Sequence, residues 1–460
     1  MVLSNEVRAG RAAVRAGRVS SRIQPHRVVS TGPRMEMSGR FRGRLGTAVA
    51  AALVAAVALL LAGCGGEPVE RIETRAAMTT EITVRVVAPD ERTARVCLES
   101  AWREMEECTI RLDRWTEGSD VARINANAGK FHVNVDPLTV SCLAAAKEAS
   151  TKSGGAFDPT VGPLLSLWRK AEQRNRAPTD EELADARSRI GMDKVEILAG
   201  VVQRPLSEMD PAPPGAPPPD PEDLQKTVHT VGVREGMELN LGGIAKGYVA
   251  GRMARRMQRH GAMAGLVAAA GDVYAFGRRP ASLAPKGGDR RWGVAVQDPR
   301  YPDDRTKHYT AVRLEDQAVD TSGHYYRGYE IQGKHYSHIL DPRTGRPVDT
   351  RLASATVVAR DPALSDGLAT AMAVLGIQKG LAVVESLEGV ECLLLEWAPV
   401  PASVEGDQET RGPRPLVAHR SSGFAALEFD PSRLADEGPT EPEATPETAA
   451  PAEAAPSAAP

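Results

Sequence analysis

The stretch Leu239–Tyr248, which reads L-N-L-G-G-I-A-K-G-Y, constrains the fold of this chain more than any other. Three glycines in ten residues allow the backbone to adopt φ > 0 and to approach a ligand or another segment closely. Lys246 adds a point charge suited to an anion such as phosphate. Glycine-rich turns also precede helices for packing reasons alone. The stretch by itself therefore leaves a packing role and an anion site equally open.

Composition limits the class of protein. A chain of 460 residues is long enough for one large domain or two ordinary ones, and its 25% charged and 42% apolar residues are typical of globular proteins. The net charge of -3 argues against a dedicated nucleic-acid binder, so we expect no nucleic-acid partner. The cysteines that follow Cys64 show neither C-x-x-C nor Cys/His metal spacing, which predicts small core residues.

The N-terminus has the pattern of an export signal. Residues 1–46 hold ten arginines and two glutamates, and the apolar run Thr47–Ala62 precedes L-L-A-G-C. Because a membrane-spanning helix needs about 20 residues, this run suits a signal segment better. We predict a signal peptide with a basic extension over 1–63 and lipidation at Cys64, with an uncleaved anchor helix as the alternative. Either form places the body outside the cytoplasm at a membrane.

The rest of the chain divides by composition. We expect a lipidated tether over 64–77, a folded domain over 78–429, and a disordered acidic Pro/Ala tail over 430–460, which has little apolar content. The segment 205–221 holds eight prolines in seventeen residues and predicts an exposed insertion.

The pattern of apolar residues predicts the fold class. Apolar periodicity and capping residues predict helices over 91–112, 136–153, 163–173, 244–258 and 361–375. Runs of β-rich residues lie between them, and we expect one of these strands over Gly265–Ala275. Helices and strands do not alternate strictly, so the class is α+β, with mixed sheets and packed helices.

Two residues on the last of these helices suit a metal ion. Asp366 and Thr370 are four apart and share a helix face, with small residues around them. A carboxylate and a hydroxyl are hard oxygen ligands of the kind Mg²⁺ takes together with substrate phosphates. A solvated helix face carrying a chance Asp/Thr pair is the alternative.

Other segments offer acid–base and ring-binding groups. His338 in S-H-I-L-D-P titrates near neutrality and can accept a hydroxyl proton, or it can simply hydrogen-bond a turn. Asp341 can orient His338 or cap the turn. Ala156-Phe157-Asp158 offers an aromatic face and a carboxylate, which suits either a flat ring or a core Phe beside a capping Asp. For Gly271-Asp272, after a strand, we expect a structural turn.

Taken together, these segments resemble the ApbE family of FAD:protein FMN transferases. The matching pieces are M-T-T at Met78, S-D-V-A-R-I-N at Ser119, G-A-F-D-P-T-V-G-P-L at Gly155, N-L-G-G-I-A-K-G-Y at Asn240, A-G-D-V at Ala270, V-D-T-S-G at Val319, Y-S-H-I-L-D-P-R-T-G at Tyr336 and S-D-G-L-A-T-A at Ser365. They occur in the family's order from about Ala77 to Trp397.

The resemblance implies an ApbE-like, tunnel-fold-related domain in a lipoprotein. It further implies Mg²⁺-dependent transfer of FMN from FAD to a Thr or Ser hydroxyl of a target protein, with AMP released. Carried over by motif, the magnesium ligands are Gly243, Asp366 and Thr370, and the base is His338. The implied FAD contacts are Met78, Trp115, Ala156, Phe157, Asp158, Asn240, Lys246 and Asp341.

The resemblance also implies an acceptor protein, for which a membrane redox subunit is expected, and a lipid-anchored location on the extracytoplasmic side of the cell or outer membrane. Two other activities remain open. One is FAD hydrolysis to FMN and AMP, with water in place of the acceptor hydroxyl. The other is flavin binding without catalysis.

Overall fold

A computed structural model describes residues 67–78, 80–203, 225–285, 288–323, 328–348, 351–399 and 414–437. All of them belong to one compact unit, Gly65–Pro460. The expected signal segment 1–63, the lipidation site Cys64 and the proline-rich insertion 205–221 lie outside the described residues. They therefore stay predictions.

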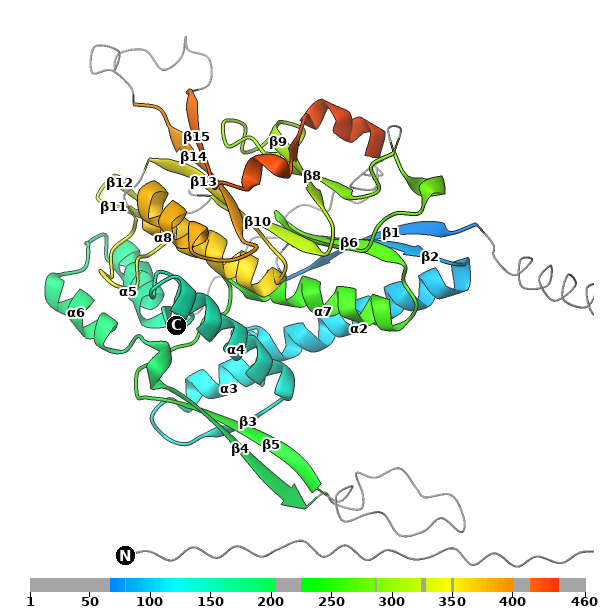
Figure 1. The fold of residues 1–460 in the computed structure, drawn as a ribbon. Helices are drawn as coiled ribbons and strands as arrows, with labels where there is room; N and C mark the ends of the chain where they lie inside the picture. The colour runs from blue at the N-terminus through cyan, green and yellow to red at the C-terminus, as the bar shows by residue number, and fades with distance from the viewer. Residues whose placement is uncertain are drawn as a thin grey trace, which may run out of the picture. The chain divides into compact units, whose positions relative to one another are not determined.

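An eight-stranded sheet in the order β1-β2-β6-β7-β10-β13-β14-β15 forms the centre of the fold (Figure 1). Its strands are β1 (Val69–Ala77), β2 (Thr80–Ala88), β6 (Ala264–Ala269), β7 (Asp272–Phe276), β10 (Gln317–Gly323), β13 (Leu352–Ala359), β14 (Glu391–Trp397) and β15 (Leu416–Arg420). Where mixed sheets were expected, the pairings between these strands are antiparallel. Short connections such as β1–β2 and β6–β7 permit only that arrangement.

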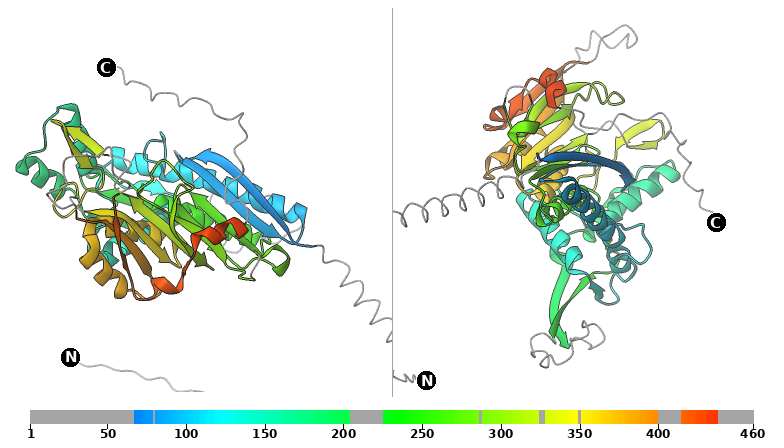
Figure 2. Two further views of the ribbon diagram at one scale, coloured as in Figure 1. Left: turned by 90° about the horizontal axis from the view of Figure 1, so that it is seen from above. Right: turned by 90° about the vertical axis from the view of Figure 1, so that its right-hand side faces the viewer.

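Both faces of this sheet are buried, because side chains alternate along each strand. On β2, Val84 and Val86 face the helices, whereas Val87 faces the other side. Helices α2 (Glu91–Leu112), α4 (Pro137–Lys152), α7 (Ala245–Arg259) and α8 (Pro362–Glu385) form the layer on the first face (Figure 2). A small sheet, β16-β9-β8 (Glu428–Phe429, His308–Leu314, Trp292–Gln297), covers much of the second face, with Trp292 fully buried between the two sheets.

Capping residues start the helices where the sequence predicts. The Asp136 carboxylate accepts from the Leu138 amide and Pro137 follows it, while Asp361 accepts from Leu364 with Pro362 next in α8. α8 continues beyond its expected end at 375 and breaks at Gly376, where φ is 70°. Among the described residues, α8 is the helix long and apolar enough to span a membrane. Its first half is buried against β10 and β13, as expected of a core helix.

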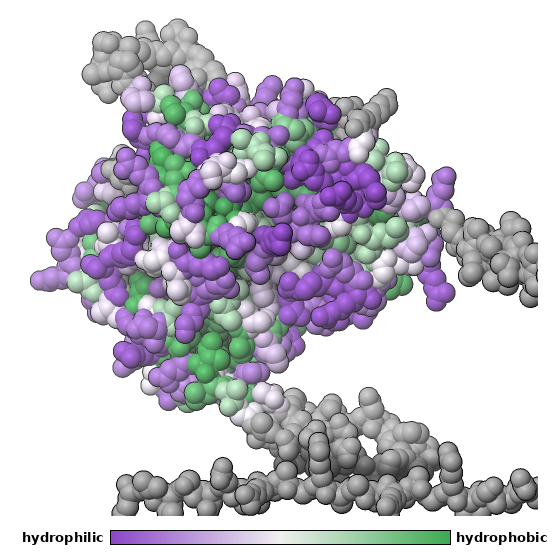
Figure 3. Space-filling view, viewed as in Figure 1, coloured by the Kyte–Doolittle hydropathy of each residue, from purple (hydrophilic) through white to green (hydrophobic). Residues whose placement is uncertain are grey.

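The remaining elements surround this core. They are α3 (Asp120–Ala126), α5 (Gly162–Gln173), α6 (Asp180–Ser188), a hairpin β11–β12 (Gly328–Ile331, Lys334–Ser337), and a projecting sheet β3-β5-β4 (Val133–Val135, Gln225–Val233, Val195–Gln203). The surface is mainly hydrophilic, with an apolar patch where the projecting sheet leaves the body (Figure 3). On β4, Ile197 and Leu198 are exposed.

The structure confirms the α+β class and the buried, free state of the four cysteines that it describes. It corrects the residue bounds of three predicted segments. Residues 69–77 of the expected tether form β1, which pairs with β2 along its whole length. The expected strand Gly265–Ala275 is two strands, because Ala270, with φ of 57°, reverses the chain after β6. The expected tail begins with a 3₁₀ helix, Pro431–Glu437, which contacts β8 and β9.

Helices α7 and α8 cross in close contact because glycines occupy the α7 side of the crossing. A Cβ built on Gly247 would lie 2.1 Å from the Pro362 carbonyl oxygen and 2.9 Å from the Asp366 Cβ. A Cβ on Gly251, one turn later, would lie 2.6 Å from the Pro362 ring. Each distance is shorter than real contacts allow, so only glycine fits. This crossing brings the start of α7 to the acidic residue of α8.

We expect Gly247→Ala to lower the free energy of unfolding by about 1–3 kcal/mol, because the new methyl group overpacks the crossing and outweighs the helix propensity gained. Gly271→Ala is the matched control, since a Cβ at Gly271 meets nothing within 4 Å and its φ is ordinary. Urea unfolding measures both variants. Equal stability of the two would contradict the assigned crossing.

Candidate active site

The glycine turn is held in place by segments far away in sequence. The Asn125 side chain donates to the Leu239 carbonyl oxygen at 3.0 Å and accepts from the Leu239 amide at 2.7 Å. The Asn240 amide donates to the Pro159 carbonyl at 2.6 Å. The Asn240 side-chain oxygen accepts from the Gly242 amide at 2.9 Å and tightens the turn. Three of the motifs found in the sequence therefore meet at this turn.

The start of α7 contacts the acidic face of α8 directly. The Gly247 amide donates to Asp366 Oδ2 at 3.0 Å, and Lys246 Nζ lies 3.6 Å from Asp366 Oδ1. Thr370, one turn later, has its hydroxyl 3.4 Å from that of Ser322 on β10. A Cβ on Gly243 would lie 3.2 Å from Thr370 Oγ1. The structure thus brings together the three residues expected to hold a metal.

Lys246 also contacts a carboxylate that the sequence reading assigned to a turn. Its Nζ lies 2.5 Å from Asp272 Oδ2 on β7, so Asp272, which stands at the expected turn between β6 and β7, also pairs with the lysine. The Asp272 side chain is 6% exposed and that of Asp366 is 4% exposed, whereas Lys246 keeps 29% of its side chain accessible. Both carboxylates are therefore almost fully buried, and the lysine side chain that pairs with them is partly exposed.

A third carboxylate, Asp320, was not singled out in the sequence. It stands opposite Asp272 in the β7–β10 pairing and is 1% exposed. The signal was present, because an aspartate in the strand pattern V-D-T-S-G, beside apolar neighbours, is rarely buried without a partner. A lysine at a buried helix start likewise requires counter-charges nearby.

The pKa values of this cluster follow from burial and mutual charge. Burial raises the pKa of Asp272 to about 6, against the lowering effect of Lys246, and the charge of Asp366 raises it further. Burial and the neighbouring carboxylates Asp272 and Asp366 raise the pKa of Asp320 well above its ordinary value. Burial alone would lower the pKa of Lys246, but Asp272 and Asp366 raise it above its usual value.

The expected flavin-binding turn lies next to the glycine turn. Phe157 is 4% exposed, and its Cε2 would lie 3.2 Å from a Cβ on Gly243. Ala156 is buried. Asp158 accepts from the Thr160 amide at 2.8 Å and from the Thr160 hydroxyl at 2.6 Å, and burial raises its pKa. These contacts match the alternative of a core Phe beside a capping Asp; flavin contact by these residues stays a prediction.

Two further candidates lie in turns. Met78 has a φ of 51° between β1 and β2 and packs at the edge of the core. Trp115, after α2, is 67% exposed, with the guanidinium carbons of Arg114 and Arg169 at 4.5 and 5.3 Å from its ring. The indole therefore lies at the surface beside two cations, which attract its ring.

His338 follows β12 directly and is half-buried. Asp341 accepts from the Arg343 amide at 2.9 Å and from its guanidinium at 2.8 and 2.9 Å, which fits the turn-capping alternative. A cavity of about 410 Å³ lies between this loop and α8, lined by Asp341, Thr344, Arg346, Pro347, Val348, Val374, Leu375 and Gly376. Val374 is one turn beyond Thr370, so the loop after His338 borders the same cavity as the turn of α8 that follows Thr370.

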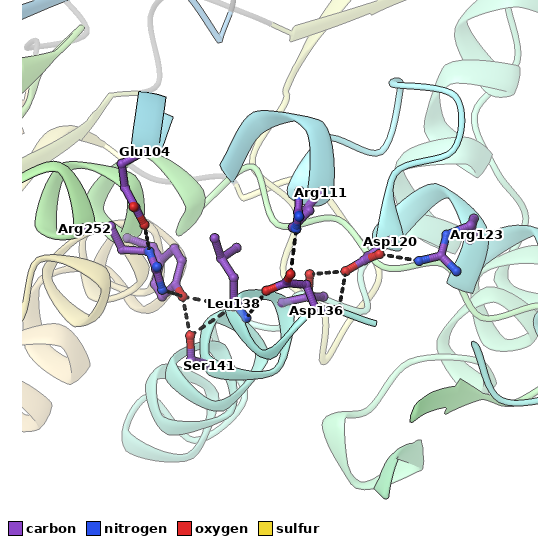
Figure 4. A network of polar contacts seen from close by, with 10 residues as sticks. Glu104, Arg111, Asp120, Arg123, Asp136, Leu138, Ser141 and Arg252 are labelled. Carbon is purple, nitrogen blue, oxygen red and sulfur yellow. Dashed lines mark hydrogen bonds and ion pairs between the residues drawn. The ribbon is translucent and has the colours of Figure 1, made fainter. Parts of the chain in front are cut away.

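A polar network fixes α7 from behind (Figure 4). Glu104 on α2 is 2% exposed and pairs with Arg252 and with Arg256, the latter at 2.8 Å. The Tyr248 hydroxyl donates to the Leu138 carbonyl at 2.9 Å on α4. Since these contacts lie within three turns of Lys246 on the same helix, they set the position of the lysine.

Comparison with known proteins identifies the family. Residues 78–394 match the ApbE family. The FAD:protein FMN transferase of Treponema pallidum (strain Nichols) is 31% identical over 337 residues, which cover 72% of this chain and 86% of that protein. That of Vibrio cholerae (strain O395) is 28% identical over 340 residues, 71% of this chain and 88% of that protein.

Solved structures show the same fold. The apo flavinyl transferase ApbE of Pseudomonas stutzeri superimposes with a TM-score of 0.58 at 26% identity, over 78% of this chain and 97% of that one. The ApbE protein of Thermotoga maritima gives 0.58 at 29% identity, over 79% and 100%. With the match over most of its length, this chain belongs to the ApbE family.

The pKa of Asp272 gives a pH dependence of stability. Because the folded carboxyl holds its proton up to pH about 6 and the unfolded one only to 3.8, the free energy of unfolding should fall as pH rises between those values, by roughly 3 kcal/mol at most. Asp272→Asn should make this fall shallower in the metal-free protein, because Asp320, whose pKa is also raised, still contributes in the same direction. Urea unfolding from pH 4 to 7 measures the difference. Asp289→Asn, which removes a carboxylate whose pKa Arg291 lowers to about 2, should retain the full fall.

Proposed function

We propose that this chain transfers FMN from FAD to a threonine or serine hydroxyl of an acceptor protein and releases AMP. Family membership and the names of its relatives support the reaction. The observation that carries the proposal is the meeting of Lys246 and Gly247 with Asp366 and Thr370, because a diphosphate needs positive charge and oxygen-bound cations at one place.

The donor set fits magnesium. Among the described residues, no group of three or more His, Cys, Asp or Glu side chains is placed to hold a metal ion. Mg²⁺ instead accepts one carboxylate with neutral oxygens and takes its remaining ligands from water and substrate phosphates. Asp366, Thr370 and the backbone at Gly243 would hold the ion, which would neutralise charge on the diphosphate when bound.

The chain's own groups perform the rest. His338 would accept the proton of the acceptor hydroxyl, whose oxygen forms a bond to the phosphorus nearest riboflavin while the bond from that phosphorus to the AMP oxygen breaks. Lys246, partly exposed above the carboxylates, would offset charge on the leaving phosphate. The exposed Trp115 ring between Arg114 and Arg169 would bind a flat part of FAD.

The location belongs to the same proposal. The expected lipid on Cys64 would anchor the protein at a membrane on the extracytoplasmic side, where a membrane redox subunit is the proposed acceptor. Metabolic labelling with a radioactive fatty acid checks the anchor, since Cys64→Ser should remove the label. A label that persists in this variant would exclude this cysteine as the attachment site.

Asp366→Ala should reduce metal-dependent transfer by about 10²–10³-fold, because it removes the single carboxylate offered to the ion. The assay incubates the folded domain with FAD, Mg²⁺ and an acceptor protein and measures in-gel flavin fluorescence of the acceptor. Asp361→Asn is the control: Asp361 caps the same helix, and asparagine caps equally well. Unchanged transfer in Asp366→Ala would refute the assigned ligand.

His338→Ala should lower transfer by about 10²–10⁴-fold, as expected for loss of a general base, while FAD binding stays close to wild type. His419→Ala is the matched control, since His419 lies on β15 and pairs with Glu396 at 3.0 Å. AMP release without a labelled acceptor would instead indicate FAD hydrolysis. Tight FAD binding with no product would indicate a flavin carrier.

A further inference from the structure

The loop that carries His338 is closed by hydrogen bonds within its own backbone. The Gly345 amide donates to the Asp341 carbonyl at 2.8 Å, and the Asp341 amide donates to the Arg346 carbonyl at 2.9 Å. Gly345 has a φ of 76°, which lets the chain turn back at this point. Because these bonds join the two sides of the loop, any element that holds the loop also sets the position of His338.

Trp168 on α5 contacts this loop on both sides of His338. Its indole Nε1–H donates to the Gly345 carbonyl oxygen at 2.9 Å. Its ring packs against that of Tyr336, just before His338, with the ring centroids 5.2 Å apart and the planes at 44°. Trp168 is 2% exposed and Gly345 is buried. Without the indole N–H, a buried carbonyl oxygen would lose its partner, which is costly.

The hairpin that leads into the loop is fixed to the same helix. Tyr329 and Tyr336 are opposite each other in the β11–β12 pairing, and both rings contact that of Trp168, at centroid distances of 6.1 and 5.2 Å. The Glu330 amide donates to the Glu172 carboxylate on α5 at 2.9 Å. The hairpin, the loop and α5 are therefore held together by aromatic contacts and by hydrogen bonds.

Helix α5 is in turn fixed to the segment before the glycine turn. The Gly162 amide donates to the Glu238 carbonyl at 3.2 Å, and the Ser166 hydroxyl donates to the Glu238 carboxylate at 2.9 Å. A Cβ on Gly162 would lie 2.4 Å from that carbonyl oxygen, so the two segments are in close contact. Glu238 immediately precedes the turn that leads to Lys246. One helix thus connects the lysine site with Trp168 and the loop.

We propose that Trp168 is a positioning residue for the transfer reaction. Through Tyr336 and Gly345 it fixes the His338 loop on α5, and through α5 it keeps that loop in place relative to Lys246. A general base must lie within hydrogen-bond reach of the proton that it takes, and a shift of about 1 Å can slow a reaction about 100-fold. The kinetic part of this role rests on the proposed transferase function, whereas the order of the loop does not.

Trp168→Phe removes the indole N–H and keeps an aromatic ring at the contact. In the transfer assay with FAD, Mg²⁺ and the acceptor, it should lower kcat by about 10-fold or more and keep KM for FAD within about twofold, since the proposed FAD contacts are left in place. Trp102→Phe is the matched control. Trp102 is 1% exposed, and its Nε1 has no hydrogen-bond partner in the part of the chain that the structure describes, so kcat should stay unchanged.

Tyr336 tests the other side of the contact. Tyr336→Leu removes the ring that packs on Trp168 and should lower kcat, whereas Tyr336→Phe keeps the ring and should retain kcat. Unchanged kcat in Trp168→Phe would overturn the proposal. An equal fall in Trp102→Phe would also overturn it, because general loss of packing would then explain both results.

A second readout needs no turnover. Amide hydrogen exchange, followed by mass spectrometry, reports on the backbone hydrogen bonds of the loop. Trp168→Phe should speed exchange over 338–348 by about tenfold, the effect of one lost hydrogen bond, and leave α2 unchanged. Trp102→Phe should not change exchange in the loop. Unchanged loop exchange in Trp168→Phe would overturn the proposal.

The exchange measurement also covers two other results. If Trp168→Phe exchanges throughout the chain, as an unfolded protein does, Tyr336→Leu decides by the same measurement on the loop. If wild type transfers no FMN, loop exchange still decides whether Trp168 holds the loop, and only the transferase proposal fails.

Discussion

The site depends on the close crossing of α7 and α8. Gly247 lets the two backbones approach, and its amide then donates to the carboxylate of Asp366. One residue therefore serves both packing and chemistry, since a side chain there would separate the helices and remove the hydrogen bond together. The same close approach of the helices places Lys246, the preceding residue, next to the acidic cluster. The contacts of Lys246 and Gly247 with Asp366 both require this distance between the helices.

The crossing is supported on both sides. Behind α7, ion pairs with the buried Glu104 hold the helix to α2, and the hydrogen bond from Tyr248 to Leu138 holds it to α4. In front, strands β7 and β10 present Asp272 and Asp320 at matched positions of the sheet. Buried ion pairs add little net stability on average, but breaking one leaves an uncompensated charge. Their effect here is to permit one position of α7.

Local signals in the sequence predicted much of this arrangement. Asp136-Pro137 and Asp361-Pro362 marked helix starts, and the four-residue spacing of Asp366 and Thr370 placed them on one face. The motif order indicated the ApbE family, and the family match confirms it. These features depend on neighbours along the chain, which is why they could be read from it.

The parts of the site and fold that the sequence did not predict depend on pairing between strands that are distant along the chain. The sequence predicts only a turn at Asp272, because no local pattern shows that β6 and β7 form a hairpin that places this carboxylate next to Lys246. Only the register of β10 with β7 shows that Asp320 lies opposite Asp272. The sequence predicts a tether where the structure has strand β1, because polar and apolar residues alternate only weakly in this segment. Its pairing with β2 shows that the segment is a strand.

The break at Gly376 divides α8 into two pieces. The first piece, with Asp366 and Thr370, is buried between the sheet and its neighbouring helices, while the second is partly exposed and begins after a residue with positive φ. The second piece still packs into the same core, since Val384 is fully buried and a Cβ on Gly380 would lie 3.1 Å from Met372 Sδ in the first piece. The glycine thus redirects a helix that is too long to continue straight over the sheet, while both of its halves contribute to a single apolar interior.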